Sequence, residues 1–203
     1  RERNRLLKDQ VRDPAWYGAL ERQMAEAGAA LTVNRLEAIA ALEAAQTLRE
    51  TAFPTARLAL VAEGPILTEA DALAGALAEG RFRDLAAGRT LVGPHRADLD
   101  AVYVAKDVAA RLCSTGEQKA LLVALILANA KALADSFGAP PILLLDEVAA
   151  HLDPARRAAL YAEVAALGAQ AWMTGTEPAL FEDLTGDALR LTVSEQDGVS
   201  TVS

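Results

Sequence analysis

The sequence predicts an α/β fold with a partial parallel sheet, joined to an α-helical arm. Four aliphatic residues, 142–145, follow a Pro-Pro pair and run directly into Asp146 and Glu147. Such a short apolar run is typical of a strand that is buried on both faces. A helical pattern over 154–167 and a strand pattern over 170–174 complete a β-α-β unit, whose crossover implies parallel strands. The first ~50 residues have the apolar spacing of a helix.

The arm begins with a strong helix-start signal. Asp13 is an N-cap acceptor, and Pro14 suits the first helical position. Apolar residues then recur at spacings of three and four, and the helical pattern reaches about Phe53, just before Pro54. A helix of this length is above the globular mean, which indicates an arm or an elongated helical hairpin.

The middle of the chain predicts a strand over 57–62, a helix over 68–87 and strands over 89–93 and 99–104. Because the pattern changes after that helix, we place a domain boundary near residue 88, with the arm in 1–88 and the sheet-containing domain in 89–203. In the second part, an apolar helix over 117–137 precedes the strand 142–146. The tail predicts a hairpin of 189–193 and 199–202 around Asp197-Gly198.

Composition narrows the class of protein. The single cysteine, Cys113, excludes an internal disulfide framework and fits a reducing cytoplasm. No apolar run approaches the ~20 residues that span a bilayer, and the N-terminus lacks the apolar core of a secretion signal, so we expect no membrane partner. The formal net charge is −8, so any DNA contact requires a local basic patch or another part of the protein.

The paired carboxylates are the first candidate functional group. Ligands of open α/β sheets bind at the carboxyl ends of strands, where Asp146 and Glu147 are expected. One acid there can hold Mg²⁺ for a nucleotide, and the second can orient an attacking water. The alternative is two solvated loop residues, or a cap for the next helix.

Ser114-Thr115-Gly116-Glu117 immediately precedes the long apolar helix. Ser114 and Glu117 have the spacing of a capping box, which alone would explain them. The functional alternative is an anion site, because a serine hydroxyl and free backbone N–H groups meet at a helix start. Gly116 would allow a phosphate to approach the backbone. In His151-Leu152-Asp153-Pro154, the last two residues repeat the helix-start chemistry, and His151 alone is more typical of a loop.

The order of these segments resembles an ABC-type ATPase. Residues 113–117 resemble the signature motif, with threonine for its first glycine and glutamate for its glutamine. The strand ending in Asp146-Glu147 resembles a Walker B strand, and Leu152-Asp153 resembles the D-loop. Within that superfamily the chain is similar to the RecF family, through Gly93-Pro94-His95-Arg96-Ala97-Asp98 and residues 114–122 and 143–148.

The resemblance implies an ATP-dependent DNA-binding protein of DNA replication, recombinational repair of DNA damage and the SOS response, which helps to load recombinase at gaps. ATP and Mg²⁺ would be its cofactors, and it would act as a nucleotide-driven homodimer. Asp146 would hold the metal and Glu147 would activate the water. The nucleotide-contacting residues would be Ser114, Thr115, Gly116, Glu117, Asp153, Thr174 and Thr176. His95 and Arg96 would contact DNA, and mediator proteins such as RecR and RecO would be partners.

The sequence departs from the ATPase pattern in two places, and each departure leads to a prediction. The phosphate-cradling loop Gly-x-x-x-x-Gly-Lys-Ser/Thr occurs nowhere in these 203 residues. We therefore expect a C-terminal portion that binds little or no ATP alone, and a weak DNA-dependent ATPase in the full-length protein. The second departure is the switch position after strand 170–174, where many ABC ATPases have histidine and this chain has Thr174 and Thr176. Either hydroxyl could bond a γ-phosphate or a water.

Two other functions remain open from the sequence. The nucleotide-binding subunit of an ABC transporter shares the ATPase chemistry, but the long helical arm and the missing switch histidine argue against it. A non-catalytic module for dimerisation or partner docking fits the absent phosphate loop.

Overall fold

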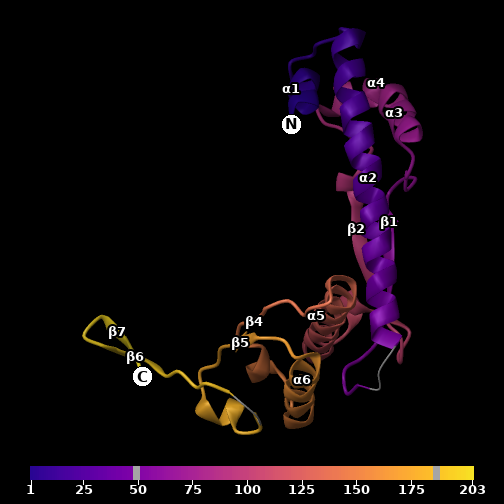
Figure 1. Ribbon diagram of the computed structural model, residues 1–203. Coiled ribbons are helices and arrows are strands. Elements are labelled where there is room, and N and C mark those ends of the chain that lie inside the picture. The colour runs from indigo at the N-terminus through magenta and orange to yellow at the C-terminus, as the bar shows by residue number, and fades with distance from the viewer. Residues whose placement is uncertain (48–50, 185–187) are drawn as a thin grey trace. The chain divides into compact units, whose positions relative to one another are not determined.

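The computed structural model describes residues 1–47, 51–184 and 188–203 (Figure 1). The chain forms two compact units, of which the first comprises Arg1–Glu50 and Pro54–Ala132 and the second Thr51–Phe53 and Leu133–Ser203. The units therefore divide within helix α5 (Thr115–Phe137). The predicted boundary near residue 88 separates an arm from an ATPase portion by function. That functional division stays a prediction.

The first unit begins with two helices, α1 (Glu2–Lys8) and α2 (Pro14–Thr47). The predicted start of α2 is confirmed, because the Ala15 N–H donates to Asp13 Oδ1 at 2.8 Å. With 34 residues, α2 is roughly 50 Å long. The predicted extension to about Phe53 runs through 48–50, which lie outside the described residues, and it is wrong at Phe53, which lies in a bend.

The predicted helix over 68–87 forms as two helices, α3 (Ala70–Glu79) and α4 (Arg81–Ala87), which meet at Gly80. The α3 residues Leu73 and Leu77 are buried against Ala25 of α2. Gly28 of α2 permits this approach, because a Cβ there would lie 2.7 Å from Leu73 Cδ2. The small side chains of α2 therefore determine how closely α3 packs.

A buried ion cluster joins the helices of this unit. Arg3 of α1 pairs with Glu21 of α2 at 3.0 Å and with Asp84 of α4 at 2.7 Å, and all three side chains are at most 3% exposed. Arg81 also pairs with Glu21, at 2.5 Å. Buried charges are tolerated only when they are paired and hydrogen-bonded, so this cluster fixes α1, α2 and α4 together.

The predicted strand over 89–93 is wrong. This segment is irregular, because side chains satisfy its backbone in place of a neighbouring strand. The Thr90 N–H donates to Asn4 Oδ1 at 2.9 Å, and the Leu91 N–H donates to Asp84 Oδ1 at 3.0 Å. The 3₁₀ turn η1 (Pro94–Arg96) follows.

The sheet of the first unit is antiparallel and has the order β1 (Ala56–Ala62), β2 (Ala97–Tyr103), β3 (Val108–Ala109). The predicted strands 57–62 and 99–104 are thus confirmed, with β2 starting two residues earlier. Ala56 and Leu58 of β1 form a buried cluster with Leu121 of α5. After β3, the turn η2 (Ala110–Leu112) leads directly into α5. The start of α5 is therefore anchored to this sheet.

Helix α5 is long and apolar enough, by length and composition, to cross a membrane, which corrects the expectation that no segment reaches that length. Core helices have the same composition. The buried side chains of α5 lie within 120–130, and Leu121 among them packs against β1.

The second unit contains the predicted β-α-β arrangement. Strands β4 (Leu143–Leu145) and β5 (Ala171–Met173) are parallel, with Leu145 opposite Met173, and α6 (Pro154–Leu167) forms the crossover. The predicted hairpin forms, with its second strand confirmed as β7 (Val199–Val202), but its first strand is β6 (Val193–Gln196) and not 189–193. Asp197 and Gly198 have φ of 54° and 76°, the left-handed pair that a tight two-residue turn requires.

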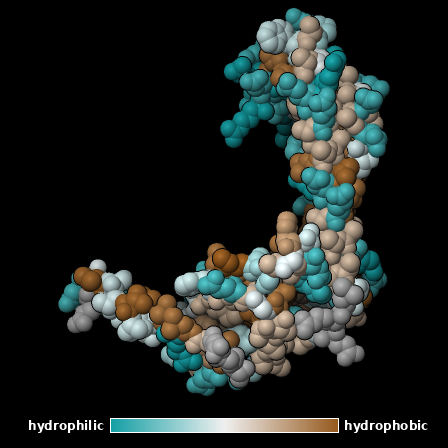
Figure 2. Space-filling view, viewed as in Figure 1, coloured by the Kyte–Doolittle hydropathy of each residue, from teal (hydrophilic) through white to brown (hydrophobic). Residues whose placement is uncertain are grey.

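The expectation that the first strand of this unit is buried on both faces is wrong. Leu143 and Leu145 are buried, but Leu144 between them is 76% exposed. Ile142 and Trp172 are also exposed, at 62% and 55%. Figure 2 shows hydrophobic surface near β4. Within the described residues, β4 pairs only with β5, so this two-stranded sheet leaves one apolar face uncovered.

Candidate functional site

The two carboxylates lie where the sequence places them, at the carboxyl end of β4. Asp146 and Glu147 follow Leu145 directly, and both are exposed. Thr174 follows β5 in the same way, and the parallel pairing brings it to the same edge. Its hydroxyl donates to Asp146 Oδ1 at 2.5 Å and accepts from the Glu147 N–H at 2.9 Å. One threonine therefore bridges both acidic residues.

The backbone of Glu147 is left-handed, with φ 51° and ψ 16°. Non-glycine residues rarely adopt this conformation, and it persists where neighbouring contacts hold it. Here the hydrogen bond to Thr174 holds the Glu147 N–H, and the short turn η3 (Val148–His151) follows. The backbone of Glu147 thus sets the direction of its Cα–Cβ bond.

The sequence leaves two threonines as candidates for the switch position. Thr174 bonds the Asp146 carboxylate and the Glu147 backbone N–H, whereas Thr176 makes no side-chain hydrogen bond to the parts of the chain that the structure describes. Gly175 between them packs against Phe181, whose ring would lie 3.0 Å from a Cβ at this position. The structure therefore joins Thr174 alone to the acidic pair.

Asp153 caps helix α6. Its Oδ1 accepts from the Arg156 N–H at 2.9 Å, and Pro154 occupies the first helical turn, as the sequence predicts. Leu152, on its N-terminal side, is 7% exposed. Structure thus explains the Leu-Asp-Pro turn as a helix start, with Asp153 at the surface. The His151 side chain lies outside the described part of the chain.

The capping box at the start of α5 is confirmed. Glu117 Oε2 accepts from the Ser114 N–H at 2.9 Å and from the Ser114 hydroxyl at 2.8 Å. The Glu117 N–H donates back to Ser114 Oγ at 3.4 Å. A Cβ at Gly116 would meet nothing within 4 Å, so the space beside the helix start is open. Ser114 and Thr115 are both exposed there.

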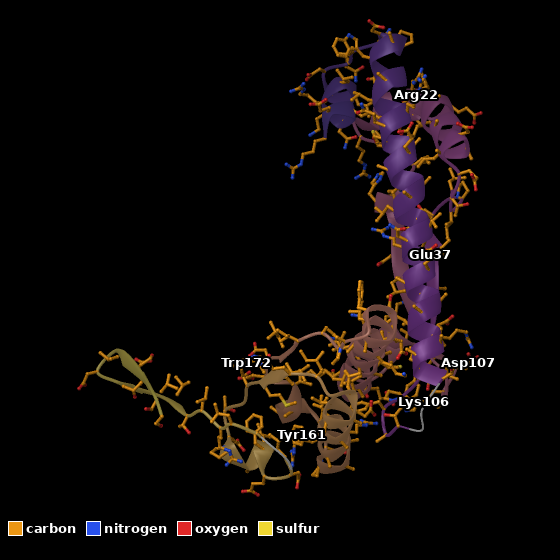
Figure 3. The ribbon with its side chains drawn as sticks, in the orientation of Figure 1. Arg22, Glu37, Lys106, Asp107, Tyr161 and Trp172 are labelled. Carbon is orange, nitrogen blue, oxygen red and sulfur yellow. The ribbon has the colours of Figure 1, made fainter. Side chains whose placement is uncertain are left out.

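Sequence reasoning missed Lys106, which forms an ion pair with Glu117 Oε1. Lys106 lies on the turn between β2 and β3, and Figure 3 shows it beside Asp107. The hydrogen bond from Lys106, followed by those from Ser114, lowers the pKa of Glu117 to about 2. The same hydrogen bond raises the pKa of Lys106. Glu117 is therefore a carboxylate at any physiological pH.

The Gly-Pro-His-Arg segment forms a tight turn that is tied to the arm. Gly93 has φ 130°, a conformation that only glycine adopts easily. His95 Nε2 bonds the Thr90 carbonyl at 3.1 Å, and Arg35 donates to the Pro94 carbonyl at 2.6 Å. Arg96 pairs with Glu63. His95 is exposed, whereas the charge of Arg96 is already opposed by an acid.

Comparison with known proteins identifies relatives over nearly the whole chain. No protein-family model matches it. It is 50% identical to the DNA replication and repair protein RecF of Rhizobium rhizogenes, over 96% of this chain and 54% of that protein. It is 49% identical to the protein of the same name from Brucella abortus, over 96% of this chain and 53% of that protein. This chain belongs to the RecF family.

The fold agrees with that assignment. A solved structure described as the recombination mediator protein RecF-ATP in the RecFOR pathway matches 100% of this chain and 55% of that chain, with a TM-score of 0.75 and 24% identity. At this identity the match shows the fold alone, and it agrees with the predicted α/β class, in which a parallel strand pair is joined to a helical arm. The chain spans about half the length of the curated RecF relatives that it matches.

The residues of this RecF-family chain fit one mode of metal binding. Within 1–47, 51–184 and 188–203, no three His, Cys, Asp or Glu side chains gather into a metal cluster. Mg²⁺ does not need such a cluster, because it is commonly held by one or two carboxylates together with phosphates and water. Asp146, exposed at a strand end, has the chemistry for this mode. Residues 114–117 belong to the first unit and the two carboxylates to the second.

Proposed function

We propose that this chain is part of an ATP-dependent DNA-binding protein of DNA replication and recombinational repair, which works as a nucleotide-driven dimer. The observation that carries the proposal is the contact of Thr174 with both Asp146 and Glu147 at the ends of two parallel strands. Strand ends of this type are where α/β proteins bind nucleotides. The names of the RecF relatives support the biological process.

Asp146 and Glu147 would have different roles in ATP hydrolysis. Asp146 would hold Mg²⁺, which neutralises phosphate charge, and Glu147 would orient or deprotonate the attacking water. Thr174 holds the Glu147 N–H and one oxygen of Asp146, so the Asp146 carboxylate and the Glu147 backbone keep their relative position. Preorganisation of this kind lowers the barrier without any change in the groups that react. Asp153 and Thr176, which are exposed, would line the approach of the nucleotide.

The start of α5 would complete the site of a second protomer. Ser114, with the first N–H groups of the helix, offers donors to an anion, and the open space at Gly116 admits one. The phosphate-cradling loop would come from a part of the protein beyond these 203 residues, which the half-length match to the relatives supports. Because neither half-site is complete alone, nucleotide binding and dimerisation would be coupled.

His95 and Arg96 are the proposed DNA contacts. Because the formal net charge of the chain is −8, DNA would bind only at a local surface. RecR and RecO are the proposed mediator partners, and the cytoplasm is the proposed location. The solved structure whose description names the RecFOR pathway supports this context for its own protein.

One other function has an observation in its favour. The exposed apolar face formed by Ile142, Leu144 and Trp172 suits a docking module that lacks catalysis. Such a module would use this surface for contact and would not need the Thr174 contacts with Asp146 and Glu147. A transporter subunit has no support from relatives that are named for DNA replication and repair.

The test is a Glu147→Gln variant of the full-length protein. Turnover should fall by about 10²- to 10⁴-fold, the usual contribution of a general base, while ATP still drives dimerisation. Phosphate release measures the first and sedimentation velocity the second. The control is Glu195→Gln, an exposed glutamate on β6. Normal hydrolysis in Glu147→Gln would remove the general-base role, and a wild-type protein that does not dimerise with ATP would overturn the proposed function.

A further inference from the structure

The start of α5 contains a negative charge where the proposed function requires an anion to bind. Glu117 Oε2 lies 2.8 Å from the Ser114 hydroxyl and 2.9 Å from the Ser114 backbone nitrogen. Both donors are therefore already committed to a carboxylate. An incoming phosphate would have to displace that carboxylate and would be repelled by it at close range.

Lys106 is placed to counter this charge. It contacts Glu117 Oε1, whereas Ser114 contacts Oε2, so the two partners use different oxygens of one carboxylate. The Glu117 side chain is 20% exposed and that of Lys106 is 54% exposed. Solvent screens the Lys106–Glu117 ion pair only partly on the Glu117 side. The bond of Lys106 to Oε1 remains when Oε2 releases Ser114.

The turn that carries Lys106 is held independently of Glu117. Tyr103 and Val108 are directly paired across the turn. Asp107, with φ 51°, accepts from Arg57 of β1 at 2.8 Å. The ammonium group of Lys106 also lies 5.9 Å from the centre of the Tyr103 ring, within the range of a cation–π contact. The sheet thus presents Lys106 at a defined place beside the start of α5.

We propose that Lys106 is a positioning residue for Ser114. It neutralises Glu117 and holds its Oε1 atom. Ser114 can then transfer its hydroxyl and N–H donors from Glu117 Oε2 to a nucleotide phosphate. The carboxylate stays on Lys106 during this exchange, so no unpaired negative charge faces the phosphate. The inference rests on the proposed function, because it assigns a regulator to that same half-site.

A purely structural role for Lys106 predicts a different pattern of variants. If Lys106 only fastens the β2–β3 turn to α5, it does so through Glu117, so Glu117→Gln breaks the same link and is as harmful as loss of Lys106. If it neutralises Glu117, removal of that charge makes Lys106 dispensable. Coupling between two contacting residues is measured by a double-mutant cycle.

The experiment uses the full-length protein and a non-hydrolysable ATP analogue, with dimerisation measured by sedimentation velocity. Lys106→Met should weaken nucleotide-dependent dimerisation by roughly tenfold, the size of coupling that contacting residues show. Lys106→Arg should retain it. Glu117→Gln and the double variant Lys106→Met/Glu117→Gln should both associate as well as wild type. Lys8→Met, which removes an exposed lysine at the end of α1, is the matched control and should behave as wild type.

The outcomes separate the two proposals. A Glu117→Gln protein or a double variant as poor as Lys106→Met would overturn the neutralising role, as would a Lys106→Met protein that dimerises like wild type. If wild type itself shows no nucleotide-dependent dimer, the proposed function fails and the role of Lys106 fails with it.

Discussion

The Thr174 hydroxyl donates a hydrogen bond to Asp146 Oδ1 at 2.5 Å, and this contact joins the ends of two parallel strands. The bond also orders the neighbouring residue, because the same oxygen atom of Thr174 accepts from the Glu147 N–H. Thr174 offers a hydroxyl where many ABC ATPases have histidine, and this hydroxyl holds the Asp146 carboxylate and the Glu147 backbone.

The first prediction concerns this hydroxyl. Thr174→Val keeps the shape of the side chain but removes both hydrogen bonds, so the left-handed backbone of Glu147 loses its restraint. ATP turnover of the full-length protein should fall by roughly 10- to 100-fold, while stability changes by only about 1–2 kcal/mol. Steady-state phosphate release and urea unfolding measure the two effects. Thr176→Val is the control, and a larger loss in that variant would contradict the assignment.

The second prediction concerns the pH dependence of stability. The pKa of Glu117 is lowered from 4.5 to about 2, mainly by Lys106 and then by Ser114. A carboxyl whose folded pKa is depressed stabilises the fold above its unfolded pKa, and this contribution is lost as pH falls through the folded value. The loss should therefore occur between about pH 4.5 and pH 2. Urea unfolding of Glu117→Gln across this window should show a weaker pH dependence than wild type, and identical slopes would refute the ion pair.

The third prediction concerns the buried ion cluster. Arg3→Met leaves Asp84 buried without its arginine partner and removes one of the two arginines on Glu21. Breaking a buried pair in this way costs about 3–5 kcal/mol in the free energy of unfolding. Arg5→Met, on the exposed side of α1, should stay within about 0.5 kcal/mol of wild type. Equal stabilities in urea unfolding would mean that the cluster is not a buried support of the arm.

The fourth prediction concerns DNA binding by the Gly-Pro-His-Arg turn. Glu63 opposes the charge of Arg96, so Glu63→Ala should free this arginine and tighten DNA binding. Arg96→Ala should weaken binding and lower the slope of log affinity against log salt by about 1, as expected for one lost phosphate contact. Fluorescence anisotropy over a salt series measures both. Arg22→Ala, an exposed position on α2 (Figure 3), is the control. No change on either substitution would exclude Arg96 from the DNA contact.

Local signals in the sequence predicted most elements. Asp13-Pro14 and Asp153-Pro154 begin helices, and Asp197-Gly198 turns a hairpin, because each of these pairs fixes its own backbone. The irregular segment 89–93 could not be predicted in this way. Its hydrogen-bond partners include Asn4, 86 residues away from Thr90, and no pattern near residue 90 reveals them.

The sequence likewise predicted only part of the candidate site. The order of the signature and Walker B patterns indicated Ser114, Asp146 and Glu147, but it left Thr174 and Thr176 equivalent. Strand register resolved them, since it brings Thr174 to Asp146. Lys106 escaped notice because a charged residue on a turn has no periodicity, and its partner Glu117 was already explained by the capping box.

The uncovered face of β4 and β5 affects how self-association should be measured. Two-stranded sheets are marginally stable alone, and exposed apolar strands promote pairing between chains. A preparation of these 203 residues should therefore aggregate with rising concentration whether or not nucleotide is present, through Leu144 and Trp172. Only the difference between matched samples with and without ATP reports on a specific dimer. Leu144→Lys should suppress the background, which makes it the solubilised parent for work on the chain alone.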